Sequence, residues 1–121
     1  MKKFLYFADG DGADATGDAI QVLADSIAFI EPQSTTTTAI FCFNANNTQD
    51  EIILTHDDTS ATTGHRVKDI SKAVAEAANS GPHTNGMVDM VDLTNSIFYG
   101  NLSFVTGVAI DRGSNTGGIT V

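Results

Sequence analysis

Hydrophobic residues along this chain form short runs separated by polar turns, a pattern typical of β-rich proteins. The longest run, Ile20 to Pro32, changes its alternation partway. Ile20 and Val22 share one parity, whereas Ile27 and Phe29 share the other. Because a one-residue shift turns side chains to the opposite face, this change predicts a bulge or a sharp bend within one long strand.

Other runs predict further strands on either side of this one. Lys3 to Ala8 (KFLYFA) comes first, and Thr36 to Asn44 is joined to Asp50 to His56 by a short polar loop, which predicts a hairpin. Later, MVDMVDL, SIFYG and LSFVTGVAID predict two more strands around a turn near Asn101. The aspartates of MVDMVDL are three apart, which also suits a helix, but the β-rich continuation favours a strand.

One segment has a helical period instead. Val67, Ile70, Val74 and Ala77 recur at three- and four-residue spacing and make a single apolar stripe. The pattern predicts an amphipathic helix at about residues 64–79, followed by a stop at Gly81 and Pro82.

These elements predict one domain over residues 1–121, with four strands, a helix, and then two or three strands. Sequential pairing of short strands predicts a mainly β fold. The expected architecture is a small, strongly bent antiparallel barrel with one helix inserted after the fourth strand. The glycine-rich segment 112–121 is either a tail or a last short strand.

The charge balance limits the possible partners. The net charge is −9, with only six Lys and Arg against 15 Asp and Glu, which counts against broad nucleic-acid binding and against binding to anionic membranes. No apolar run is long enough to span a membrane, and the N-terminal run is too short for a secretory signal peptide. Cys42 is the only cysteine and lies in an apolar run, so we expect a buried thiol and no internal disulfide.

The stretch ADGDGADATGDA raises the question of a calcium site. Asp9, Asp11 and Asp14 offer carboxylates, and Asp18 could join them. Calcium takes six to eight oxygen ligands, however, and the glutamate of an EF-hand loop is missing. The pattern favours a solvated turn between two strands over a metal site.

No catalytic or cofactor-binding motif is present in the chain. His56, His65 and His83 lack the spacing of a zinc site, and no nucleophile elbow, phosphate loop or dinucleotide fingerprint occurs. We therefore expect no cofactor and no enzymatic activity.

The few basic residues are the candidates for binding. Arg66, Lys68 and Lys72 share the predicted helix, Arg112 stands alone near the end, and Tyr99 is a candidate stacking aromatic. One interpretation is an ordinary solvated helix face. The other is a local phosphate-binding strip whose weak charge is multiplied in a ring of subunits.

The layout resembles the Sm/LSm barrel fold. More narrowly, DSIAFIEP, AANSGP and VDMVDL resemble segments of small uncharacterised proteins from marine metagenomes and cyanophages. The segment IDRGSN, with Arg112 and Gly113, is similar to the arginine-glycine pair that faces RNA in Sm proteins. The chain departs from the Sm pattern in its helix position, which is N-terminal in Sm proteins, and in lacking a match to the aspartate-asparagine RNA pocket.

The resemblance implies a cyclic homo-oligomer of about five to seven subunits, joined through strand edges. It also implies a ring-forming protein that binds RNA or DNA through the basic residues and Tyr99, and that assists nucleic-acid processing in the host cytoplasm. The alternative is a phage structural or assembly protein, a ring or decoration component of the virion, without a nucleic-acid ligand.

Overall fold

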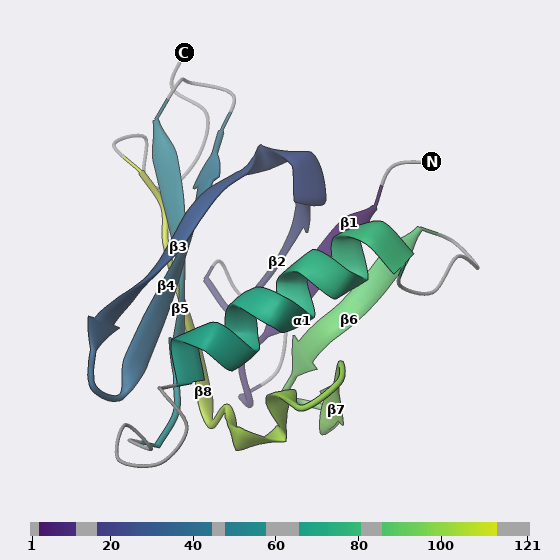
Figure 1. The fold of residues 1–121 in the computed structure, drawn as a ribbon. Coiled ribbons are helices and arrows are strands. Elements are labelled where there is room, and N and C mark those ends of the chain that lie inside the picture. Colours follow the sequence, from purple (N-terminus) through teal and green to yellow (C-terminus); the bar gives the residue numbers. More distant parts are fainter. Residues whose placement is uncertain (1–2, 12–16, 45–47, 58–65, 81–85, 114–121) are drawn as a thin grey trace.

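The strands form two open four-stranded sheets with one helix lying across them (Figure 1). This computed structural model describes residues 3–11, 17–44, 48–57, 66–80 and 86–113. In chain order the elements are β1 (Phe4–Ala8), β2 (Ala19–Leu23), the 3-10 turn η1 (Ala24–Ser26), β3 (Ile27–Ser34), β4 (Thr37–Phe43), β5 (Gln49–Thr55), α1 (Arg66–Ser80), β6 (Met87–Asp92), β7 (Ile97–Phe98), the 3-10 turn η2 (Leu102–Phe104) and β8 (Gly107–Asp111).

The predicted bend in the long apolar run is confirmed. The turn η1 breaks the run into β2 and β3, and the pairing of β3 with β4 shifts register between Ile27 and Phe29. The two halves belong to different sheets, so this bend carries the chain from one sheet to the other. Because one predicted strand is two, the helix follows the fifth strand and not the fourth.

The prediction of an antiparallel barrel needs two corrections. One sheet has the order β2-β1-β6-β7 and the other has the order β3-β4-β5-β8, and no ladder closes them into a barrel in the described ranges. In addition, β1 pairs with β6 in parallel. Sequential pairing holds for the hairpins but fails for β1. Its second neighbour is β6, which follows β5 and α1 in the sequence.

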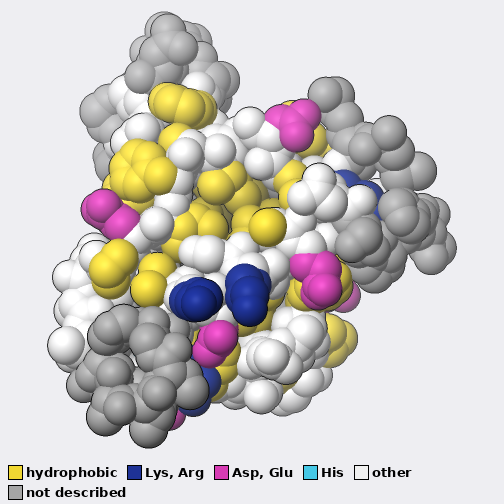
Figure 2. Space-filling view, viewed as in Figure 1, with side chains coloured by type: hydrophobic (Ala, Val, Ile, Leu, Met, Phe, Trp, Pro, Cys, Tyr) yellow, Lys and Arg dark blue, Asp and Glu magenta, His cyan; other side chains and the backbone are white. Residues whose placement is uncertain are grey.

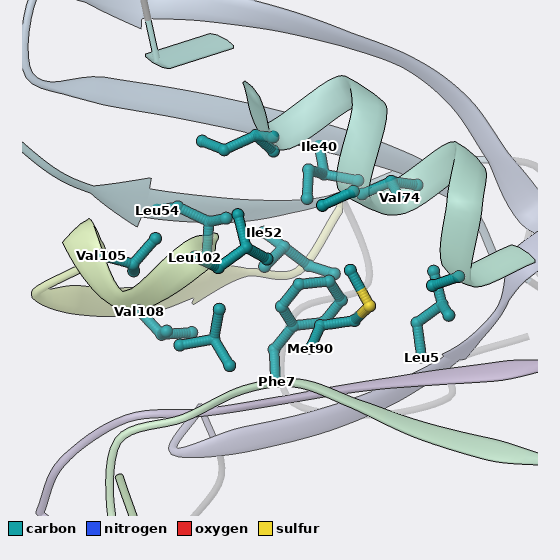
Figure 3. Close-up of a cluster of buried hydrophobic side chains, with 14 of the residues drawn as sticks. Leu5, Phe7, Ile40, Ile52, Leu54, Val74, Met90, Leu102, Val105 and Val108 are labelled. Carbon is teal, nitrogen blue, oxygen red and sulfur yellow. The ribbon is translucent and has the colours of Figure 1, made fainter. Parts of the chain in front are cut away.

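The core lies between the inner faces of the two sheets and under α1. Figure 3 shows Phe7 of β1 and Met90 of β6 pointing toward Ile52 of β5, and all three are fully buried. On α1 the predicted stripe faces this core, with Ile70 and Val74 buried. The helix contacts both β3 and β1, so it covers the gap between the sheets. Its first predicted residues, 64 and 65, fall outside the described residues.

Candidate functional site

Arg66, at the start of α1, is occupied by contacts within its own chain. Its Nε donates to Asp57 Oδ1 at 2.9 Å and its Nη2 donates to Asp57 Oδ2 at 3.3 Å. Asp69 lies 3.6 Å away on the next turn, and the guanidinium sits 4.2 Å from the ring centroid of Phe104. The hydrogen bonds from Arg66 lower the pKa of Asp57. Arg66 therefore ties the segment after β5 to α1 and η2 rather than presenting a free charge.

Arg112 is likewise part of an internal contact, beside the end of β8. Its Nε lies 3.3 Å from Oδ2 of Asp50, a mostly buried carboxylate on β5. Asp50 Oδ1 also accepts hydrogen bonds from Asn44 at 2.9 Å and from the Gly113 backbone at 2.8 Å. Burial alone would raise the pKa of Asp50, but these hydrogen bonds and the charge of Arg112 together lower it. The arginine-glycine pair thus fastens the end of β8 to β5.

Tyr99, the candidate stacking aromatic, is half-buried and packs against the core. Burial and the carboxylate of Glu76, with which it forms a hydrogen bond, raise the pKa of its hydroxyl. Its backbone N–H donates to Met90 at 3.0 Å. Tyr99 therefore joins the segment after β7 to α1 through its hydroxyl and to β6 through its backbone.

Lys68 and Lys72 remain as exposed cations one helical turn apart on α1. Neither makes an ion pair with any residue that the structure describes. Figure 2 shows two Lys or Arg side chains next to one another over the helix, with acidic side chains beside them. Lys72 also borders a shallow polar hollow of about 430 Å³ between α1 and the turn after β7, lined by Asp69, Lys72, Ala73, Glu76, Gly100 and Asn101.

The aspartate-rich stretch connects β1 to β2, as the turn interpretation predicted. The two strands pair antiparallel, and the Asp9 N–H donates to the Asp18 carbonyl at 2.8 Å. Asp9 Oδ1 accepts from the Gly10 N–H at 2.8 Å. No group of three or more His, Cys, Asp or Glu placed to hold a metal occurs in the described ranges, and Asp14 lies outside them.

A buried threonine-histidine pair lies at the end of β5. Thr38 Oγ1 is 2.8 Å from His56 Nε2, and His56 Nδ1 is 2.8 Å from the Asp57 carbonyl oxygen. Because a carbonyl only accepts, Nδ1 carries the proton and Nε2 accepts from the Thr38 hydroxyl. Thr38 is only 1% exposed, so this hydroxyl has no access to a substrate. The pair fastens β4 to β5.

The sequence did not predict an apolar patch on the outer face of the sheet β3-β4-β5-β8. Phe29 and Phe41 lie opposite one another on this face and stack with ring centroids 4.4 Å apart. Phe43, two residues further along β4, is 57% exposed, and Phe29 is 43% exposed. The alternation of phenylalanines at 41 and 43 was visible in the sequence, but both faces of this strand are apolar, which favoured a core position for these rings. That interpretation is wrong for Phe43.

Carboxylates border this patch. Glu31 lies opposite Ala39, while Glu51 lies opposite both Phe41 and Asp111. Glu31, Glu51 and Asp111 form no ion pair within the described part of the chain. The term outer sheet surface is used below for the surface formed by Phe29, Phe41, Phe43, Glu31, Glu51 and Asp111.

None of the helical segments that the structure describes has the length and apolar character needed to cross a membrane. No family model, curated protein or solved structure matches this chain. The site must therefore be interpreted from its own chemistry.

Proposed function

We propose that this protein is a self-assembling structural protein, whose copies join through the outer sheet surface. The observation that carries the proposal is the exposed stack of Phe29 and Phe41 with Phe43 beside it, on the solvent side of an antiparallel sheet. Burying apolar area stabilises by roughly 25 cal/mol per Å², so covering these three rings favours association. Contiguous aromatic patches of this kind mark protein–protein contacts.

The resemblance to Sm and cyanophage proteins supports a ring-shaped assembly, such as a ring or decoration component of a virion. The outer strands of the two sheets have no further strand partner among the described residues, which is a second ground for association. At one edge, Pro32 lacks a backbone N–H and discourages pairing along part of β3. A sheet-face contact therefore accounts for assembly better than pairing along that edge.

Light scattering on the purified protein, coupled to size exclusion and repeated over a range of concentrations, tests this proposal. We expect a closed oligomer for the wild type and a shift toward monomer for Phe43→Ser. Ile97→Ser is the matched control, because Ile97 is an exposed hydrophobic residue (43%) on the other sheet. A wild type that stays monomeric at every concentration, or an equal effect of both substitutions, would overturn the proposal.

A second candidate function is binding of RNA or DNA by such an assembly. The observation that favours it is the exposed pair Lys68 and Lys72, which has no ion pair with a described residue and which a ring would present in several copies. Arg66, Arg112 and Tyr99 contribute less to this candidate, because their side chains are engaged within the chain. Fluorescence anisotropy with labelled single-stranded RNA and DNA at two salt concentrations tests it: binding that weakens steeply with salt supports it, and unchanged anisotropy excludes it.

A further inference from the structure

The outer sheet surface contains a pair of like charges that the fold itself leaves unbalanced. Glu51 on β5 and Asp111 on β8 are directly opposite in register, on the face that also carries Phe41. Like charges directly opposite one another destabilise a sheet, and neither carboxylate has an ion pair among the described residues. A pair of cations from outside the chain would remove this repulsion.

The same chain presents a matching pair of cations elsewhere. Lys68 and Lys72 are exposed, one turn apart on α1, and lack ion pairs within the described ranges. Side chains at this helical spacing have Cβ atoms about 5–6 Å apart. Directly opposed residues of antiparallel strands have Cβ atoms about 4.5–5.5 Å apart. The Cβ atoms of the two lysines are therefore spaced much like those of the two carboxylates, and the flexible lysine stems can bring each ammonium group to a carboxylate.

The surroundings of the two pairs are also complementary. Figure 2 shows hydrophobic side chains gathered between α1 and β3, near two basic side chains that lie over the helix. The half-buried hydrophobic residues of β3 and α1 include Val67 of the helix, together with Ile27 and Ile30 of β3, which also pack against the core. On the sheet side, Phe41 is the cross-strand neighbour of Glu51. A contact that pairs the charges thus brings an aromatic surface against an apolar one.

We infer that copies of this chain assemble head to tail, with Lys68 and Lys72 of one copy contacting Glu51 and Asp111 of the next. This inference rests on the proposed function and names its interface. In Figure 1 the sheet β3-β4-β5-β8 is seen nearly edge-on at one side, whereas α1 lies across the front. The two contact surfaces point in different directions, so each copy is rotated relative to the one before it. Repeated rotation of this kind closes a ring when the angle permits.

Two complementary charge-reversal variants test the inference. The first is Lys68→Glu with Lys72→Glu, and the second is Glu51→Lys with Asp111→Lys. Each variant alone places like charges across the contact, so each should associate at least about tenfold more weakly than the wild type. The first makes the chain more acidic and the second makes it less acidic, so weakening in both cannot come from net charge. Asp11→Lys, a charge reversal in the loop after β1, is the control and should assemble normally.

Mixing the two variants gives the decisive measurement. In a head-to-tail assembly the unaltered sheet of the first variant meets the unaltered helix of the second, and the altered surfaces also have opposite charges. We expect the mixture to recover association, with the two variants alternating. Because alternation closes a ring only when the number of subunits is even, the measured quantity is the formation of complexes that contain both variants, and not ring closure. Circular dichroism and thermal unfolding verify that each variant is folded.

Charge-reversal variants that assemble like the wild type, or a mixture that does not recover, would overturn the head-to-tail contact. The proposed function fails separately, through a monomeric wild type or through equal effects of Phe43→Ser and Ile97→Ser. If Phe43→Ser alone dissociates the oligomer while both charge variants remain assembled, the outer sheet surface is the interface but α1 is not its partner.

Discussion

Asp50 and Gly113 are 63 positions apart in the sequence, yet the Gly113 N–H donates to the Asp50 carboxylate at 2.8 Å. Together with the Asn44 amide, this bond supplies donors to a mostly buried carboxylate, and the Arg112 guanidinium beside it supplies a positive charge. The end of β8 is therefore fixed by an ionised side chain, and its attachment depends on pH.

We predict that Asp50 contributes to the loss of stability in acid. Its folded pKa is lowered, whereas the unfolded value is about 3.9. The stabilisation is thus fully present above about pH 4 and is lost as the pH falls through the folded pKa. Asp50→Asn should lose about 1–3 kcal/mol at neutral pH and depend less on pH between about 5 and 2. Thermal unfolding across this range measures it, with Asp11→Asn, a change at an exposed aspartate of the loop after β1, as the control; an unchanged pH profile in Asp50→Asn would contradict the prediction.

Gly113 should not tolerate a side chain. A Cβ there would lie 2.7 Å from the Gln49 carbonyl oxygen and 2.7 Å from Thr48 Oγ1. Because the first of these atoms belongs to the backbone, the strand end has to shift, and we expect Gly113→Ala to cost about 1–3 kcal/mol. Gly10→Ala is the control, since its Cβ would make only an ordinary contact at 3.7 Å with Leu93. Urea unfolding measures the stability of both variants. Equal unfolding midpoints for Gly113→Ala and Gly10→Ala would show that the strand end relieves the clash without a loss of stability.

Thr38→Val should destabilise the protein although it preserves the shape of the side chain. Removing the hydroxyl leaves His56 Nε2 buried without its donor, which costs about 1–3 kcal/mol. Thr55→Val makes the same change at an exposed position of β5 and should have little effect. Chemical denaturation of both variants measures the difference, and a Thr38→Val protein as stable as the wild type would show that His56 finds another partner.

Cys42 should be unreactive in the folded protein. Burial raises the pKa of its thiol to about 11, and its side chain is 2% exposed. At pH 8 little thiolate is present, so labelling by a thiol reagent should require unfolding. Labelling rates with and without denaturant measure this. Rapid modification under native conditions would mean that the sheet opens locally at β4.

Local patterns were sufficient for much of the fold. The change of parity between Val22 and Ile27 predicted the bend, since side-chain direction in a strand is fixed by the backbone. The stripe of Ile70 and Val74 predicted the buried face of α1, because residues at three- and four-residue spacing lie on one face of a helix. The number of strands before the helix was wrong, because a bend within one strand and a break between two strands have similar sequence patterns; the three strands after the helix agree with the predicted two or three. The predicted barrel closure was also wrong.

The candidate site was harder to predict, because charge neutralisation depends on residues distant in the sequence. Arg112 is paired with Asp50 and Arg66 with Asp57, and no spacing rule connects either pair. The sequence therefore offered five candidate binding residues of which only Lys68 and Lys72 keep free charges in the described structure. The parallel pairing of β1 with β6 could not be predicted for a similar reason, because no turn connects these two strands directly.

That pairing has a consequence for the order in which the chain can fold. During synthesis, the antiparallel strands β3, β4 and β5 can pair soon after they leave the ribosome, because they are neighbours in the sequence. The strand β1, by contrast, has its second neighbour only when residues 87–92 are available. Non-local contacts of this kind slow folding, because a long loop must close before the contact stabilises anything. Most of the chain therefore has to be synthesised before the sheet β2-β1-β6-β7 can form.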